Sequence, residues 1–187
     1  MNKIILIGLL AAAAFTPAVH AADEASSYIG VSAGRVDQKL SVPGAGSAKD
    51  NATITKFYGG FPFDNRFALE LGYTDMGKVT AGSGTNSLGA QPKALTAAVV
   101  ITQPLGDKFA VNGKLGLAST NPTLRNHNDV RVAHGSKSSL LVGVGAVFNI
   151  TKQFAMVVEY ESYGTLVEYQ GVTLKATMAS AGIRYKF

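Results

Sequence analysis

The charged residues of this chain that have the spacing for chemistry lie within otherwise apolar segments. Five of them stand among small and apolar neighbours: Lys56, Glu70, Lys114, Glu159 and Arg184. Isolated charges would be costly in a dry interior, so we expect these side chains to pair with one another, and Glu70 with Lys56 in particular. We interpret the five residues as a structural plug. The alternative is a narrow path for ions.

A histidine and a serine two residues apart, His134 and Ser136, have the side chains of a hydrolase pair. A catalytic histidine needs an acid to orient it, and no carboxylate follows before Glu159. The polar end of a loop is therefore the favoured interpretation, and we predict no enzyme active site. The chain has no cysteine, which excludes thiolate nucleophiles and thiolate metal ligands. No metal site and no cofactor are predicted.

Basic residues also gather in one polar segment that contains a single acid, Asp129. The basic members are Arg125, His127, Arg131, His134 and Lys137. Exposed cations near a polyanionic surface gain electrostatic energy. This segment is therefore a candidate to bind the phosphates of lipopolysaccharide or sulfated host glycans, and a merely solvated loop is the alternative. The formal net charge of +5 is a mild excess without a nucleic-acid-binding module, so no nucleic-acid partner is predicted.

Alternation with a period of two predicts the elements that carry these residues. Eight segments show it, at residues 27–35, 53–61, 66–74, 94–103, 109–118, 138–148, 154–163 and 172–187. In the third, one phase is wholly apolar, with Phe67, Leu69, Leu71 and Tyr73. The second phase of the eight segments is mainly Gly and Ala with isolated charges. Such residues suit the cramped interior of an eight-stranded barrel rather than the wet face of a soluble sandwich.

The apolar phase is then expected to face lipid, where a Lys or Arg at mid-bilayer would cost roughly 2–4 kcal/mol. Connectors alternate between short, at 62–65, 104–108 and 149–153, and long, at 36–52, 75–93, 119–137 and 164–171. Short periplasmic turns and long outer loops are typical of the bacterial outer membrane, and eight strands place both termini in the periplasm. The sequence thus predicts an all-β, eight-stranded antiparallel up-and-down transmembrane β-barrel.

The first 21 residues have the layout of a secretory signal peptide. Lys3 precedes an apolar run at 4–15, and a small-residue end closes at Ala21. The apolar run is shorter than the about 20 residues that cross a bilayer as a helix, which disfavours the alternative of a membrane anchor. We expect cleavage after Ala21 and a single barrel domain at 22–187.

Three segments resemble the outer-membrane-protein-A-like transmembrane barrel family. Residues 57–73, FYGGFPFDNRFALELGY, resemble its second hairpin; residues 28–34 resemble its first strand, and residues 179–187 its closing strand. The resemblance implies an outer-membrane location among the short, surface-antigen and opacity-like members. It implies a structural or cell-surface interaction role, with outer-membrane lipid and lipopolysaccharide as surroundings and a host or surface glycan as a candidate ligand. A narrow pore for ions or small solutes is the alternative.

The resemblance also implies that the last strand is recognised by the barrel-assembly machinery, through alternate apolar residues that end at the C-terminus: Ile183, Tyr185 and Phe187. A strand that merely ends in Phe is the alternative. Deleting Phe187 is expected to slow assembly and leave the chain open to periplasmic proteases, while most of the folded barrel's stability survives, because one side chain is a small part of the apolar face. Surface levels and protease sensitivity in cells measure this, and normal surface levels in the deletion would contradict it.

Overall fold

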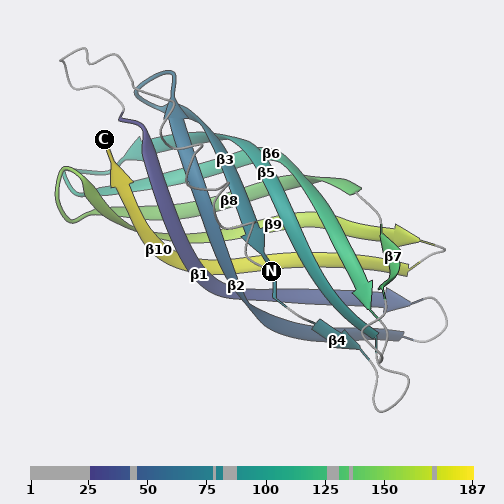
Figure 1. Cartoon of the computed structure of the whole chain (residues 1–187). Helices are drawn as coiled ribbons and strands as arrows, with labels where there is room; N and C mark the ends of the chain where they lie inside the picture. Colours follow the sequence, from purple (N-terminus) through teal and green to yellow (C-terminus); the bar gives the residue numbers. More distant parts are fainter. Residues whose placement is uncertain are drawn as a thin grey trace, which may run out of the picture.

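A computed structural model describes residues 26–42, 46–77, 79–81, 88–125, 131–134, 137–169 and 172–187. The predicted signal peptide at 1–21 lies outside these residues and stays a prediction. The described residues form ten strands (Figure 1): β1 Tyr28–Val42, β2 Gly46–Pro62, β3 Phe67–Asp75, β4 Val79–Ala81, β5 Leu88–Pro104, β6 Phe109–Arg125, β7 Arg131–His134, β8 Lys137–Asn149, β9 Phe154–Tyr169 and β10 Val172–Lys186. Within the described ranges, we find no helix with the length and apolar character needed to cross a membrane.

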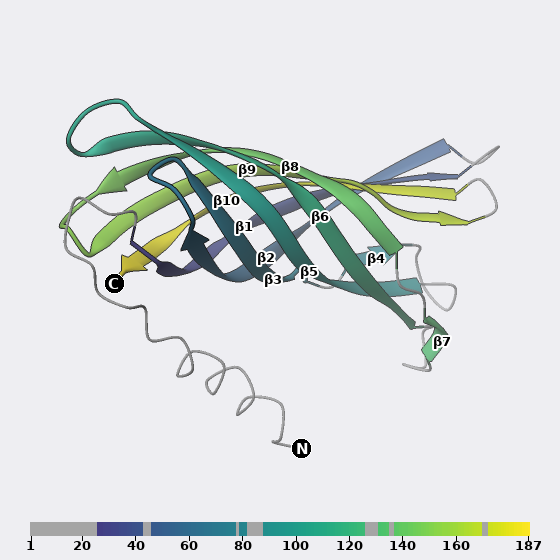
Figure 2. The same ribbon diagram turned by 90° about the horizontal axis from the view of Figure 1, so that it is seen from above.

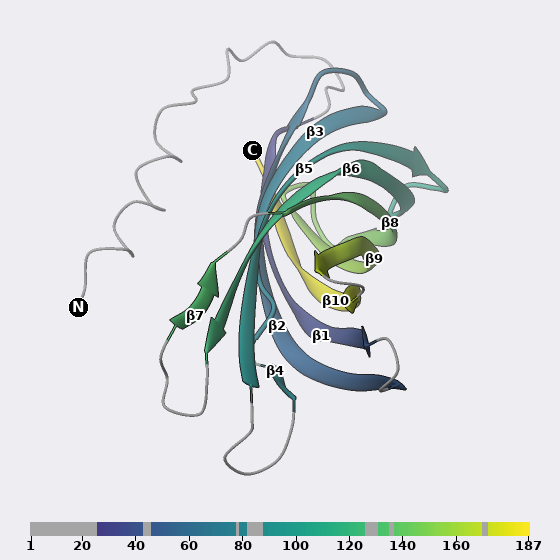
Figure 3. The ribbon, with the colours of Figure 1, turned by 90° about the vertical axis from the view of Figure 1, so that its right-hand side faces the viewer.

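Eight long strands close into one antiparallel barrel, which confirms the predicted fold class. Their order is β5-β3-β2-β1-β10-β9-β8-β6, and pairing of β5 with β6 completes the circle. The short β4 and β7 extend the ladder beside β5 and β6 at one end of the barrel (Figures 1 and 3). Closure leaves no open edge in the eight-stranded wall, so backbone N–H and C=O groups can be paired within the hydrocarbon of a membrane.

The stagger of the strands sets the width of this barrel. Paired residues can be followed once round the wall from Asn51 in β2, and the path returns to β2 at Phe61, ten residues further along. With eight strands, such a stagger inclines the strands by about 40° and leaves an interior that side chains just fill. The interior is therefore a packed core.

The two faces of the wall differ as the alternation predicts. Inward residues are small, polar or charged, and the outward phase exposes large apolar side chains, among them Phe57, Leu71, Leu117 and Val144. In β3 the alternation is direct, since Ala68 and Glu70 are buried between exposed neighbours and Thr74 is buried beside the exposed Tyr73. An outward apolar surface on a closed barrel is the arrangement that lipid requires.

The predicted long loops were wrong in extent. The first, at 36–52, is mostly strand, because β1 continues to Val42 and β2 begins at Gly46. Likewise β5 begins at Leu88, β6 ends at Arg125 and β9 ends at Tyr169. Cross-strand hydrogen bonds do not need apolar side chains, so the hairpins continue past the point where the apolar alternation ends. Periodicity located the lipid-facing part of each strand and not its end.

The short turns and the C-terminus lie together at the opposite end from β4 and β7 (Figures 1 and 2). The N–H of Phe187 donates to the carbonyl of Ser27 at 3.0 Å, and that of Lys186 donates to the carbonyl of Gln153 at 2.7 Å. These bonds bring the start of β1, the end of β10 and the turn before β9 to one rim. The extended hairpins form the other rim.

The barrel is expected to migrate differently on gels before and after boiling, because a closed, fully paired wall resists detergent until it is heated. Closure depends on the β1–β10 seam, where a Cβ on Gly182 would overlap the backbone of Val31 and Ser32. Gly182→Val should therefore reduce the heat-modifiable fraction. Gly113→Val is the matched control, since a Cβ on Gly113 meets open space. An unchanged Gly182→Val barrel would contradict the importance of this seam.

Candidate functional site

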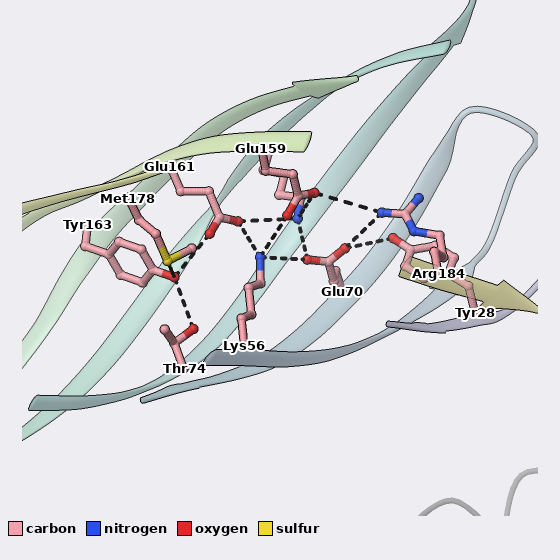
Figure 4. A network of polar contacts seen from close by, with 10 residues as sticks. Tyr28, Lys56, Glu70, Thr74, Glu159, Glu161, Tyr163, Met178 and Arg184 are labelled. Atoms are coloured by element: carbon pink, nitrogen blue, oxygen red, sulfur yellow. Dashed lines mark hydrogen bonds and ion pairs between the residues drawn. The ribbon is translucent and has the colours of Figure 1, made fainter. Parts of the chain in front are cut away.

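Six ionic side chains meet inside the barrel, three basic and three acidic, and all of them except Lys114 are labelled in Figure 4. They are Lys56 from β2, Glu70 from β3, Lys114 from β6, Glu159 and Glu161 from β9, and Arg184 from β10. Each side chain is at most 4% exposed. We call these six residues the ionic cluster. Its formal charge is zero, so the narrow interior holds no excess charge at this level.

The Lys56 ammonium contacts all three carboxylates. Its Nζ lies 2.6 Å from an oxygen of Glu161, 3.1 Å from Glu159 and 3.6 Å from Glu70. Such close charge-assisted hydrogen bonds are stronger than neutral ones. The three acids therefore surround one cation from two strands.

The Lys114 ammonium repeats this arrangement from β6. Its Nζ lies 2.6 Å from Oε1 of Glu70, 2.6 Å from Oε1 of Glu159 and 3.3 Å from Glu161. The two ammonium groups thus share the same three acids. Removing either one would leave buried carboxylates short of positive charge, and breaking such a buried pair from one side typically costs 3–5 kcal/mol.

Aromatic side chains border the ionic cluster on both sides. The Arg184 guanidinium lies 3.9 Å from the ring centroid of Tyr28, and the Tyr28 hydroxyl donates to Glu70 at 3.0 Å. On the other side, the Tyr163 hydroxyl donates to Glu161 at 3.2 Å. These contacts orient the carboxylates of Glu70 and Glu161 from the two sides of the cluster.

Glycines make room for these large inward groups. A Cβ at Gly145 in β8 would overlap the amide of Asn112 and crowd Glu159, and a Cβ at Gly60 would overlap the ring of Tyr28. The Gly-rich inward phase of the sequence is therefore the counterpart of the ionic and aromatic side chains that fill the space.

An apolar layer closes the interior between the ionic cluster and the rim of extended hairpins. Its large members are fully or almost fully buried: Val36, Ile54, Met76, Leu141, Tyr163 and Met178. Met76 follows β3, and the chain then turns at Gly77, which has a φ of 69° and whose N–H donates to the Asp75 carboxylate at 3.0 Å. We call this set the apolar plug. A smaller group with Tyr28, Tyr58 and Val100 fills the other side.

The structure brings together all five charged residues that the sequence singled out. The expected contact of Glu70 with Lys56 is present, but Lys114, from β6 on the far side of β5, lies closer to Glu70. Glu161 is the member that was missed. Its phase in β9 is that of Glu159, so the alternation contained the signal, although no spacing marked it as part of a cluster.

The ionic cluster also contains three carboxylates with ligand oxygens within 4.8 Å of one another, those of Glu70, Glu159 and Glu161. Three acids so close can hold a divalent cation. Here the Lys56 and Lys114 ammonium groups already lie among those oxygens, and they supply the positive charge that a metal would supply. The arrangement therefore works as a structural cross-link between strands.

The other predicted site residues lie at the two rims. In the basic segment, Arg125 pairs with Arg131 along the β6–β7 ladder, His134 pairs with Thr123, and Lys137 pairs with Thr120. His127, Asp129 and Ser136 lie outside the described residues, so the His134 and Ser136 hydrolase pair is not described. At the opposite rim, the proposed assembly-signal residues are exposed on the outer face: Ile183, Tyr185 and Phe187.

Comparison with known proteins agrees with this architecture. The family model for the OmpA-like transmembrane domain matches residues 22–187. The chain belongs to this family. This OmpA-like protein is therefore an eight-stranded barrel of the bacterial outer membrane. No curated protein matches its sequence.

Several solved structures share the fold of this OmpA-like barrel at low sequence identity. Neisserial surface protein A is 16% identical, with a TM-score of 0.61 over 86% of this chain and 97% of the other. Ail of Yersinia pestis, in complex with the heparin analogue sucrose octasulfate, is 18% identical, with a TM-score of 0.54 over 86% and 99%. OprG of Pseudomonas aeruginosa is 14% identical, with a TM-score of 0.57 over 87% and 96%. At such identities these likenesses show the fold alone.

A double-mutant cycle on Glu70 and Lys114 is expected to give a coupling above about 1 kcal/mol, as contacting residues do. Glu70→Ala leaves three buried cations with less compensation, those of Lys56, Lys114 and Arg184, and Lys114→Met in the same chain should recover part of the loss. Urea unfolding in detergent measures the free energies. The exposed Lys93–Asp75 pair, at 3.8 Å, is the control and should couple by less than about 1 kcal/mol. Additive effects at Glu70 and Lys114 would contradict the cluster.

Proposed function

We propose that this protein is a closed, non-conducting outer-membrane barrel that presents its extended hairpins at the cell surface for interaction with a ligand. The observation that carries this is the apolar plug above a neutral ionic cluster. Because both the apolar plug and the ionic cluster fill the interior, the barrel serves as a scaffold for the extended hairpins at its rim.

The apolar plug argues against the alternative of a narrow pore. An ion path needs water or polar groups along its whole length. Ile54, Met76 and Met178 are instead fully buried in one apolar cluster. Opening a path would require both the displacement of these side chains and the rearrangement of the six ionic residues below them. A barrel with this stagger has no spare width for either change.

For the ligand we propose a polyanion, a sulfated or phosphorylated glycan, bound by the basic segment at the hairpin rim. Three of its residues lie at paired positions on β6, β7 and β8: Arg125, Arg131 and Lys137. His127 and His134 belong to the same stretch of the sequence. Ail, which shares the fold, is known in complex with a heparin analogue, and that complex supports the same ligand class here.

The orientation belongs to this proposal. Both termini of the mature chain are placed in the periplasm, with the short turns, and the extended hairpins outside. The last strand, with Ile183, Tyr185 and Phe187 on its lipid-facing side, is proposed as the part that the barrel-assembly machinery recognises. The proposal includes no catalytic activity and no nucleic-acid partner.

Binding to heparin beads by the detergent-folded barrel tests the ligand class. The triple variant Arg125→Gln, Arg131→Gln, Lys137→Gln is expected to lose most of the binding, because the attraction is electrostatic, and salt should weaken the wild type. The control removes three exposed basic residues at the short-turn rim, Arg66, Lys108 and Lys152, and should bind normally. Equal loss in both triple variants would show attraction to net charge alone.

Planar-bilayer recording tests the closed interior. The wild-type barrel is expected to give no steady current, because the apolar plug excludes water from the path. Reproducible unit conductance from the purified protein would contradict the proposal and favour the pore.

A further inference from the structure

A hollow of about 680 Å³ lies on the lipid-facing wall of the barrel, across β5, β6, β8, β9 and β10. All but three of its lining residues belong to the outward phase of their strands, and most are apolar; they include Ile101, Val111, Gly113, Val144, Tyr160 and Ala179. Gly113 leaves open space in this wall, because a Cβ there would meet no atom within 4 Å. The hollow is open along the wall rather than enclosed, so it suits a chain that lies on the surface of the barrel.

The hollow follows one row of paired residues that ends at a cation. The row runs from Ile101 to Gly113, Val144, Tyr160 and Ala179, and the partner of Ala179 in β1 is Arg35. Arg35 is exposed on the outer face. An arginine therefore stands at the end of an apolar hollow, on the same surface.

The tilt of the strands makes this row descend into the membrane. Arg35 lies where the outward face of β1 becomes polar, since Asp37 follows it on that face. In β6, Gly113 lies six residues below Ser119, where the outward phase of that strand becomes polar. At about 3.3 Å per residue and about 40° of tilt, Gly113 is roughly 15 Å deeper than the polar boundary. The row thus connects the headgroup level to the acyl-chain level.

Further basic residues lie just beyond Arg35. Lys175 in β10 is exposed, and Lys39 in β1 pairs with both Lys175 and Lys49 in β2. Lys39, Lys49 and Lys175 therefore share one register row on three neighbouring strands. This row lies four residues along β1 from Arg35, with Asp37 as the acid between them. A net positive patch at the headgroup level attracts a phosphate.

We propose that this surface binds one lipopolysaccharide molecule, with a lipid A phosphate at Arg35 and Lys175 and an acyl chain in the hollow at Gly113. Lipid tails are as apolar as the barrel wall, so apolar character alone gives no preference for any one lipid. Preference needs a shape that fits a chain and a charge that fits its headgroup. The row from Gly113 to Arg35 supplies both. The inference uses the orientation in the proposed function, and it is independent of the ligand at the hairpin rim.

Native mass spectrometry of the delipidated, detergent-folded barrel, titrated with hexa-acylated lipid A, tests the site. The wild type is expected to retain one lipid A. Gly113→Leu fills the hollow and Arg35→Gln removes the cation, and each should weaken retention by about tenfold. Ala97→Leu enlarges an exposed side chain outside the hollow, and Lys152→Gln removes an exposed cation at the other rim; both controls should retain lipid A. Heat-modifiable mobility checks that each variant is folded. If Gly113→Leu does not fold, Gly113→Ala replaces it as the variant that reduces the hollow.

Three results would overturn the proposal. The first is equal retention by Gly113→Leu, Arg35→Gln and the wild type. The second is equal binding of phosphatidylglycerol, which would make the occupant any anionic lipid. The third is a dimer that Gly113→Leu converts to monomer, which would show that a second copy covers the hollow. The triple variant at Arg125, Arg131 and Lys137 should retain lipid A, so failure at the rim and failure at the hollow are distinguishable.

Discussion

Closure of the backbone hydrogen-bond network is the constraint on which the rest of this structure depends. Within a membrane every strand must have two partners, and eight strands with a stagger of ten residues satisfy this in the smallest practical circle. The circle is narrow, so what lies inside must be dry and closely packed. The circle also turns every outward residue toward lipid. Interior and exterior chemistry both follow from this one geometric condition.

Inside, the narrow circle decides how charges are tolerated. Six ionic groups in a confined interior are stable together because their charges sum to zero and each ammonium touches all three carboxylates. Taken singly, each would be a costly buried charge. The cluster also links strands that are not neighbours in the wall, since Lys56 in β2 and Lys114 in β6 share acids from β3 and β9. It therefore braces the barrel across its interior, and the apolar plug keeps water from weakening it.

Outside, the wall is less uniform than its apolar composition indicates. Small outward residues such as Gly113 and Ala179 leave a hollow, and the tilt that closure imposes directs the row through it toward Arg35. The hairpins extend beyond the apolar band because strands such as β2, β5 and β6 are 17 residues long, and their polar residues stay paired there as strands. The closed wall, its lipid-facing hollow and the position of the hairpins at the rim therefore all depend on the same pairing register of the strands.

The sequence by itself determined the elements and their faces. Alternation in segments such as 66–74 identified eight strands, separated the lipid-facing phase from the interior phase, and placed Lys56, Glu70, Lys114, Glu159 and Arg184 inside. Period and composition suffice for this, because side-chain direction in a strand depends only on local geometry. For the same reason Glu161 was predictable as an inward residue of the 154–163 segment.

Only the tertiary structure decided which inward residues meet. Glu70 in β3 lies nearer to Lys114 in β6 than to its hairpin neighbour Lys56, although β5 separates the two strands. Contacts between strands that do not pair depend on the stagger summed over the strand pairs between them. No single hairpin contains that sum. Register likewise decides how long the hairpins are and that Met76 packs into the apolar plug. It also places Gly113 and Arg35 on one row of paired residues. Register is a property of the closed circle as a whole, so it appears only when the last strand has paired with the first.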